Sequence, residues 1–129
     1  MTKHQKFFLC KHCGNLAGLI IDQGVPIYCC SEPMTQLEAN TTDGAQEKHG
    51  PVVQTDGRHV NVAVGSTAHP MEENHYIQFV YLQTCCGGQR KSLRPNEAPK
   101  VQFALAEGET PKAVYSYCNR HGLWKTDLV

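Results

Sequence analysis

The sequence predicts an all-β protein in which a small cysteine-rich metal domain is followed by a β-sandwich. Four cysteines fall within the first thirty residues, short apolar–polar alternations recur after Pro51, and few stretches keep a helical period over ten residues. The 129 residues suffice for one ordinary domain plus a very small one. We therefore expect a first domain at residues 1–37, a connecting loop at 38–48 and the sandwich at 49–129.

The first domain has too few apolar residues for a self-sufficient core. Residues 7–9 and 16–21 are expected to form two short strands, with a turn at residues 22–24. A unit of fewer than about 40 residues usually needs disulfides, a metal or a partner chain to fold. Residues 38–48 are polar and contain a glycine, which is typical of a linker or an exposed loop.

The remainder of the chain alternates between apolar and polar residues, as half-buried strands do. Asp56-Gly57 is a strong hairpin signal, and residues 85–88 are expected to form a further turn. The pattern indicates a sandwich of about seven strands. The segments with the clearest strand pattern are residues 52–53, 60–64, 75–82, 101–105 and 113–118.

Composition excludes several classes of protein. The formal net charge is zero, so the sequence lacks the basic footprint of a nucleic-acid-binding protein. No stretch reaches the roughly 20 apolar residues that span a bilayer, and the N-terminus lacks the apolar core of a signal peptide. We therefore expect a soluble, cytoplasmic protein without a membrane partner, in which clustered thiols stay reduced. The seven cysteines, an odd number, cannot all pair within one chain.

The first candidate site consists of the pair Cys10-x-x-Cys13 and the adjacent pair Cys29-Cys30. Four thiolates complete a tetrahedral shell, which suits zinc or a single iron ion. Because the second pair has no spacer, its side chains must splay to reach one ion, and the tetrahedron should be distorted. Structural zinc and redox iron are about equally compatible with this spacing. A thioredoxin-like thiol pair is disfavoured, since no βαβ pattern surrounds the motif.

The second candidate site consists of His49, His69, His75, Cys118 and His121. Cys118 and His121 form a C-x-x-H pair, a spacing at which both side chains reach one ion. Four imidazoles and one thiolate exceed what tetrahedral structural zinc requires. Five donors leave one octahedral position open, which indicates chemistry on a substrate.

Five motifs occur in order along the whole chain, and together they closely resemble desulfoferrodoxin, the two-iron class of superoxide reductase. The motifs are FLCKHCGN at residues 8–15, CCSEPM at 29–34, TDGAQEKH at 42–49, GSTAHPM at 65–71 and YCNRHGLW at 117–124.

The resemblance implies a desulforedoxin-like domain followed by an immunoglobulin-like β-sandwich. It implies a first iron on the four N-terminal cysteines and a second iron on four equatorial histidines, with Cys118 as the axial ligand and neither haem nor flavin. Glu47 and Lys48 match the loop residues beside the open sixth position, where Lys48 steers superoxide and Glu47 binds the resting ferric ion. The ligands so implied are Cys10, Cys13, Cys29 and Cys30 for the first iron, and His49, His69, His75, Cys118 and His121 for the second.

The function implied by the resemblance is detoxification of superoxide by one-electron reduction to hydrogen peroxide at the ferrous histidine site. The first iron would relay electrons from a small donor such as rubredoxin, and the chain would form a homodimer. Two alternatives stay open on the residues alone, namely a non-catalytic electron carrier and a zinc-stabilised binding module. Cys85-Cys86 falls outside every family motif. We expect two exposed reduced thiols there, with an inter-subunit disulfide as the alternative.

Overall fold

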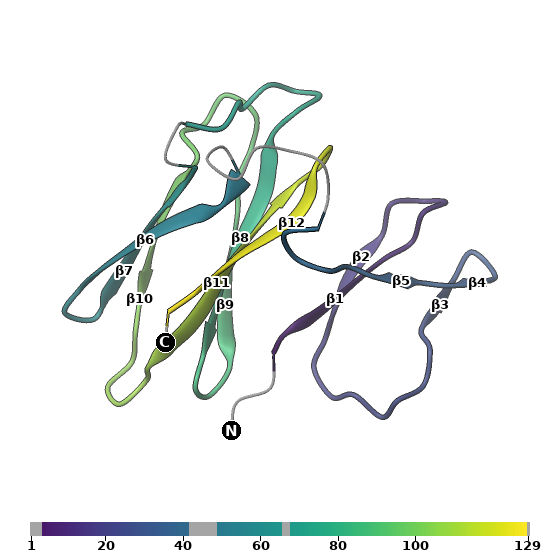
Figure 1. Ribbon diagram of the computed structural model, residues 1–129, viewed down its shortest axis with the longest axis horizontal. Helices are drawn as coiled ribbons and strands as arrows, with labels where there is room; N and C mark the ends of the chain where they lie inside the picture. Colours follow the sequence, from purple (N-terminus) through teal and green to yellow (C-terminus); the bar gives the residue numbers. More distant parts are fainter. Residues whose placement is uncertain (1–3, 42–48, 66–67, 129) are drawn as a thin grey trace. The chain divides into compact units, whose positions relative to one another are not determined.

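The computed structural model describes residues 4–41, 49–65 and 68–128. The chain is built from β-strands and divides into two compact units, Met1–Glu38 (unit 1) and Ala39–Val129 (unit 2) (Figure 1). The predicted all-β class is thereby confirmed. Within the described ranges, no helix is long and apolar enough to cross a membrane.

Unit 1 consists of short strands around one central strand. β1 lies between β2 and β5 in an antiparallel sheet, and β3 pairs with β4 in a separate hairpin. Phe7 and Cys10 are the apolar residues that this unit buries among those the structure describes, so its core is very small. The strands are β1 (Lys6–Leu9), β2 (Leu16–Leu19), β3 (Tyr28–Cys29), β4 (Glu32–Pro33) and β5 (Thr35–Gln36).

The second predicted strand of unit 1 is shorter than expected. β2 ends at Leu19, and Ile20 and Ile21 follow it as exposed residues, with exposed fractions of 96% and 71%. The predicted turn is present: the Gly24 N–H donates to Asp22 Oδ1 at 2.8 Å, and Gly24 has a φ of +76°, which glycine adopts without strain.

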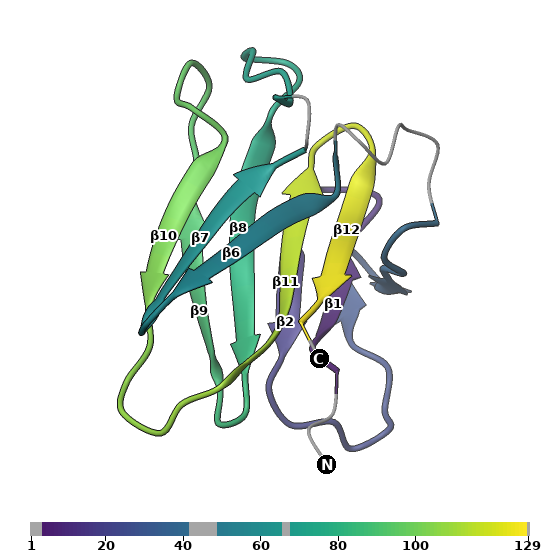
Figure 2. The same ribbon diagram turned by 60° about the vertical axis from the view of Figure 1, so that its left-hand side comes forward.

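Unit 2 is a sandwich of two antiparallel sheets (Figure 2). One sheet has the order β10-β7-β6, and the other has the order β12-β11-β8-β9. The total of seven strands among the described residues agrees with the predicted number. The strands are β6 (Pro51–Asp56), β7 (His59–Val64), β8 (Ile77–Thr84), β9 (Gly88–Ser92), β10 (Lys100–Ala104), β11 (Pro111–Cys118) and β12 (Gly122–Asp127).

The core of unit 2 lies between the two sheets and follows the alternation seen in the sequence. Val60, Val62 and Val64 are buried along β7, whereas the residues between them are partly exposed. Phe103 from β10 and Val80 from β8 are fully buried and belong to the same cluster. Successive side chains of a strand point to opposite faces, so this period-2 pattern directs the valines inward.

Three strand assignments differ from expectation. β8 begins at Ile77 rather than at residue 75, because Glu72 and His75 exchange backbone hydrogen bonds of 2.9 and 3.1 Å in an isolated bridge before the strand. β9 and β12 carried no clear strand pattern. β9 lies at a sheet edge and is largely exposed, so it needs few apolar residues. β12 is also an edge strand and is joined to β11 by a short turn.

Candidate metal centres

The first cluster joins the turn after β1 to the hairpin between β3 and β4. The Gly14 N–H donates to the Cys10 carbonyl at 2.8 Å, and the positive φ of Gly14, +85°, lets the chain turn tightly behind Cys13. Cys29 ends β3, and Cys30 starts the turn that follows. The four Sγ atoms lie within 4.8 Å of one another.

The hairpin between β3 and β4 explains how two adjacent cysteines reach one position. Cys29 pairs with Glu32, so Cys30 and Ser31 form a two-residue loop, with φ angles of +54° and +62°. Positive φ at both central positions is the type I′ geometry, which normally favours glycine or asparagine. A left-handed conformation costs a residue with a Cβ roughly 1–2 kcal/mol. Such strain is typical of positions that a binding site requires.

The four sulfur atoms fit a tetrahedral metal shell. A metal–sulfur distance of about 2.3 Å gives sulfur–sulfur edges of about 3.8 Å, and Cys13 Sγ lies 3.6 Å from Cys29 Sγ. The backbone N–H of Cys13 is the main cause that lowers the pKa of Cys10 to about 6. Cys10, Cys13 and Cys29 in turn raise the pKa of Cys30 to about 12. Thiolates this close together repel one another, so a bound cation would stabilise the cluster.

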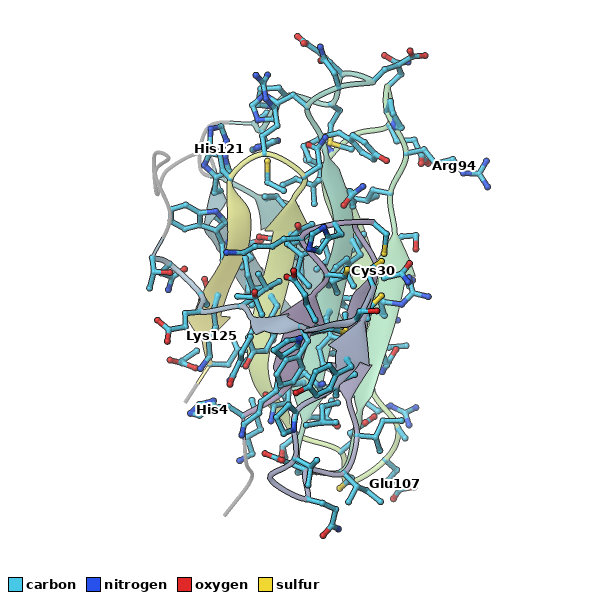
Figure 3. All side chains as sticks on the ribbon, turned by 90° about the vertical axis from the view of Figure 1, so that its right-hand side faces the viewer. His4, Cys30, Arg94, Glu107, His121 and Lys125 are labelled. Atoms are coloured by element: carbon cyan, nitrogen blue, oxygen red, sulfur yellow. The ribbon has the colours of Figure 1, made fainter. Side chains whose placement is uncertain are left out.

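The second cluster is assembled at one end of unit 2 from three loops and a strand end. His49 precedes β6, His69 lies between β7 and β8, and His75 stands two residues before β8. Cys118 ends β11, and His121 lies in the turn to β12 at this end of the sandwich (Figure 3). The five donor atoms lie within 4.8 Å of one another, so the structure brings together all five residues that the sequence singled out.

The four imidazoles form a closed ring in the order His49, His69, His75, His121. Ring centroids of neighbours are 4.6, 4.9, 5.0 and 4.6 Å apart, and each ring stands at 69–82° to the next. His49 Nε2 lies 2.9 Å from His121 Nδ1. Four nitrogens in a square about a metal, each at about 2.1 Å, would be about 3.0 Å from their neighbours. The distance between His49 and His121 is therefore close to that expected between neighbouring ligands of one metal ion.

Two ring nitrogens inside this cluster are buried without a hydrogen-bond partner, namely Nε2 of His69 and Nε2 of His75. His69 Nδ1 lies 2.6 Å from the Pro70 carbonyl oxygen. A carbonyl oxygen only accepts, so Nδ1 carries the proton and Nε2 presents a lone pair to the cluster. A buried polar atom left unpaired costs about 1–3 kcal/mol. A metal ion would satisfy both nitrogens, so these residues fit a metal.

Burial keeps the histidines in the form that binds metals. Desolvation lowers the pKa of His69 to about 4, although its hydrogen bond to Pro70 acts in the opposite direction. Desolvation, followed by the nearby charges of His121 and Arg120, also lowers the pKa of His75. Both imidazoles are therefore neutral at neutral pH, and the neutral ring is the one that ligates.

Cys118 and Ser116 attach the cluster to the centre of a sheet. β11 lies between β12 and β8, and the Cys118 side chain at its end is completely buried. Cys118 Sγ lies 3.9 Å from His121 Nδ1. Two positions earlier, the buried Ser116 hydroxyl donates to the His49 carbonyl at 2.8 Å, which ties the loop that bears His49 to the same strand.

Trp124 supports two of the histidines at once. Its Nε1–H donates to the His121 carbonyl at 3.1 Å, and its ring stacks on His49 with centroids 5.1 Å apart. In the sequence, Trp124 belongs to a family motif, but no role was predicted for it. Ser116 and the Pro70 carbonyl were not predicted to contribute to the site. The alternation of residues along the strand was the one signal that could have identified Ser116 as an inward-facing residue. The contacts of Trp124 and of the Pro70 carbonyl depend on loop conformation.

Replacing Trp124 by phenylalanine should weaken metal binding at the histidine cluster while unit 2 stays folded. The variant keeps a ring against His49 but loses the donor to His121, and loss of such an outer contact costs about tenfold in metal affinity. Competition with an iron chelator measures the effect. Tyr115→Phe, which removes a buried hydroxyl bonded to Gln83 on the same sheet, is the matched control. Unchanged affinity in Trp124→Phe would refute the role of Trp124.

The other two predicted site residues, Glu47 and Lys48, lie outside the residues that the structure describes.

Comparison with known proteins agrees with the fold. A family model described as Desulfoferrodoxin matches residues 41–127. Desulfoferrodoxin of Nitratidesulfovibrio vulgaris is 37% identical over 98% of this chain and 99% of its own length. A desulfoferrodoxin homolog of Methanothermobacter thermautotrophicus is 40% identical over 96% and 99%.

Solved structures extend the comparison to three dimensions. The superoxide reductase of Treponema pallidum matches with a TM-score of 0.82 and 38% identity, over 97% of this chain and 100% of that one. A superoxide reductase (1Fe-SOR) of Giardia intestinalis matches with a TM-score of 0.56 and 29% identity, over 64% and 97%. The fold and the two donor clusters thus define a metal-binding oxidoreductase. The chain belongs to the desulfoferrodoxin family.

Proposed function

We propose that this protein is a superoxide reductase, which adds one electron and two protons to superoxide and releases hydrogen peroxide. The observation that carries the proposal is the ring of four imidazoles beside the buried Cys118 thiol, with two unpaired ring nitrogens inside it. The names and structures of the matched relatives support the same activity. Iron held there would supply the transferred electron at a sixth position that none of the five residues fills.

The protein residues would act mainly by fixing the donors. His49, His69 and His75 face the cluster through Nε2, and His121 through Nδ1, the atoms that are close or unpaired in the structure. The bond to the Pro70 carbonyl orients the His69 ring, and the bond from Trp124 holds the backbone of His121, as outer contacts do in many metal sites. Burial of Cys118 keeps solvent and oxidants away from its sulfur.

Glu47 and Lys48 are proposed to serve the open position, on the strength of the family motif. Lys48 would raise the local concentration of the superoxide anion. Since the formal net charge of the chain is zero, such attraction must come from local charges. Glu47 would supply a carboxylate to the resting ferric ion.

Lys48→Ala is expected to slow the second-order reaction of the reduced protein with superoxide about tenfold at low ionic strength, because a steering charge is removed. The difference should shrink in added salt, which screens the charge. Rapid mixing or pulse radiolysis gives the rate. Lys112→Ala, at the opposite end of β11 from Cys118, is the matched control. An unchanged rate for Lys48→Ala at low salt would exclude steering by this residue.

We also propose that unit 1 holds the first iron on its four cysteines and relays electrons to the histidine site. Cys13 and Cys30 are exposed, whereas Cys10 is buried, so one side of the cluster is open to a small protein donor such as rubredoxin. The domain assignment follows from this: residues 1–37 form the relay domain, 38–48 carry the active-site loop and 49–129 form the catalytic domain.

A homodimer is proposed because unit 1 buries few apolar side chains and exposes several large ones. Ile20, Ile21, Val25 and Tyr28 are exposed by 65–96%, an apolar surface that a second subunit would cover. A cytoplasmic location is proposed as well, since all seven cysteines are free thiols in the structure and a reducing compartment keeps them so.

Counting products tests the proposed reaction. Protein reduced beforehand should convert each superoxide into one hydrogen peroxide without releasing dioxygen, and one electron should leave the protein for each turnover. Dismutation would instead release one dioxygen for every two superoxide ions. An electron carrier without an open site should show no fast second-order reaction with superoxide. Either of these outcomes would overturn the proposal.

A further inference from the structure

The turn between β8 and β9 holds two neighbouring cysteines that belong to neither metal cluster. The Thr84 N–H donates to the Gly87 carbonyl at 3.0 Å, so Cys85 and Cys86 occupy the centre of the turn. Their Sγ atoms are 2.6 Å apart. A disulfide bond is about 2.05 Å long, so both cysteines are free thiols whose sulfur atoms are close enough to form one.

Cys85 is anchored on the side where the chain enters β11. Its N–H donates to the Thr110 carbonyl at 2.9 Å, and the Thr110 N–H donates back to Cys85 Sγ at 3.4 Å. An N–H that points at sulfur stabilises the thiolate, and the pKa of Cys85 is lowered, first by the Cys86 thiol and then by Thr110. The hydrogen bond with Cys85 raises the pKa of Cys86, whose side chain is exposed.

A carboxylate two residues from β11 holds the turn in this conformation. The Thr84 hydroxyl donates to Glu109 Oε2 at 2.8 Å and accepts a hydrogen bond from the Cys86 N–H at 3.3 Å. Glu109 Oε1 accepts from the Ala106 N–H at 3.0 Å. Both cysteines are thus held through their backbone N–H groups, with their sulfur atoms close together.

The cysteine pair is far from the histidine cluster. His75 precedes β8 and Cys85 follows it, and the eight residues of this strand span roughly 23 Å at about 3.3 Å per residue. Figure 3 shows Glu107, from the loop that contacts the pair, at the opposite end of the sandwich from His121. Cys85 and Cys86 therefore cannot ligate a metal ion held by the histidine cluster.

We propose that Cys85 and Cys86 form a dithiol that hydroperoxides oxidise to a disulfide within one chain. The Cys85 thiolate attacks one oxygen of hydrogen peroxide, the O–O bond breaks, and the other oxygen leaves as hydroxide, which takes up a proton. Cys85 is now a sulfenic acid. The Cys86 sulfur then attacks the Cys85 sulfur, its proton is lost, and the S–O bond breaks to release a second water. Two electrons pass from the two sulfurs to the peroxide.

The resulting disulfide should be easily reduced. The peptide bond between the two cysteines is trans, which holds their Cα atoms about 3.8 Å apart. Ordinary disulfides join Cα atoms about 4.4–6.8 Å apart. A bridge held outside this range is strained, and strained, exposed disulfides are the labile ones. The pair is therefore suited to reversible oxidation rather than to stabilising the fold.

Peptide mass spectrometry of the full, metal-loaded protein tests the proposal. After a brief exposure to a small excess of hydrogen peroxide, the peptide that contains both cysteines should lose two hydrogens and resist alkylation. Dithiothreitol should restore both thiols. Because peroxide is added as a reagent, the outcome is independent of whether the protein reduces superoxide. Two thiols that stay open to alkylation, or a disulfide-linked dimer through these residues, would overturn the proposal.

Two single variants test which of the two cysteines reacts first with peroxide. Cys86→Ser should accumulate a sulfenic acid at Cys85 that a dimedone probe labels, whereas Cys85→Ser should give several-fold less label at Cys86. Equal labelling in the two variants would contradict Cys85 as the attacking sulfur. The double variant Cys85→Ser/Cys86→Ser should form no disulfide in this peptide and should react with superoxide as the unmodified protein does.

Discussion

Replacing His69 by alanine is expected to remove the iron of the histidine site while the cysteine site stays loaded. The Nδ1 of His69 is hydrogen-bonded to the Pro70 carbonyl, and its buried Nε2, which has no hydrogen-bond partner, is left to bind a metal. Loss of an outer contact already weakens metal sites 10- to 100-fold, so loss of a direct ligand should weaken binding by at least about 100-fold. Iron analysis should fall from two ions per chain to one, and the fast reaction with superoxide should disappear.

Two controls make the His69→Ala result interpretable. His59→Ala removes an exposed histidine of β7 outside the cluster and should keep both irons. His69→Gln keeps most of the side-chain volume, so it separates loss of a ligand from loss of packing. Retention of two irons and a normal superoxide rate by both His69 variants would show that His69 is not a ligand.

Replacing Cys30 by serine is expected to empty the cysteine site and to unfold unit 1. This unit buries only Phe7 and Cys10 among its described apolar residues, so the metal must supply much of its stability. Iron should fall to one ion per chain, and residues 1–38 should become sensitive to protease. Chemically reduced protein should still react with superoxide at close to the original rate, because the histidine site is intact.

The neighbouring residue provides a matched control for Cys30→Ser. Ser31 shares the left-handed turn, with a φ of +62°, and glycine adopts that conformation without strain. Ser31→Gly should therefore keep both irons and the protease resistance of unit 1. If Cys30→Ser keeps two irons, the four-cysteine assignment is wrong. If it loses the superoxide reaction as well, the two sites are not independent.

The two clusters of candidate donors could be predicted from the sequence, because the spacing of possible metal ligands is visible in it. Cys10-x-x-Cys13 and Cys118-x-x-His121 each place two donors within reach of one ion, and both clusters assemble as expected. The strand alternation around Val60 to Val64 likewise predicted the core, since the period of a strand fixes which face is buried.

Other features depend on contacts between distant segments, which spacing does not encode. The ring order of the imidazoles, the Nδ1 proton of His69 and the support from Trp124 follow from how three loops pack together. The left-handed turn at Cys30 and Ser31 could not be predicted, because this conformation normally favours glycine or asparagine rather than cysteine or serine. β9 was not predicted, because a polar edge strand lacks the apolar face that marks a strand in a sequence.

Iron content per chain tests the central claim most directly. Protein purified under reducing conditions, or refolded with ferrous iron, should contain two iron ions per chain, bound in two different thiolate environments. The oxidised protein should then show two distinct sets of thiolate-to-iron absorption bands. Two zinc ions and no iron would contradict the account, since neither an electron relay nor superoxide reduction is possible without a redox metal.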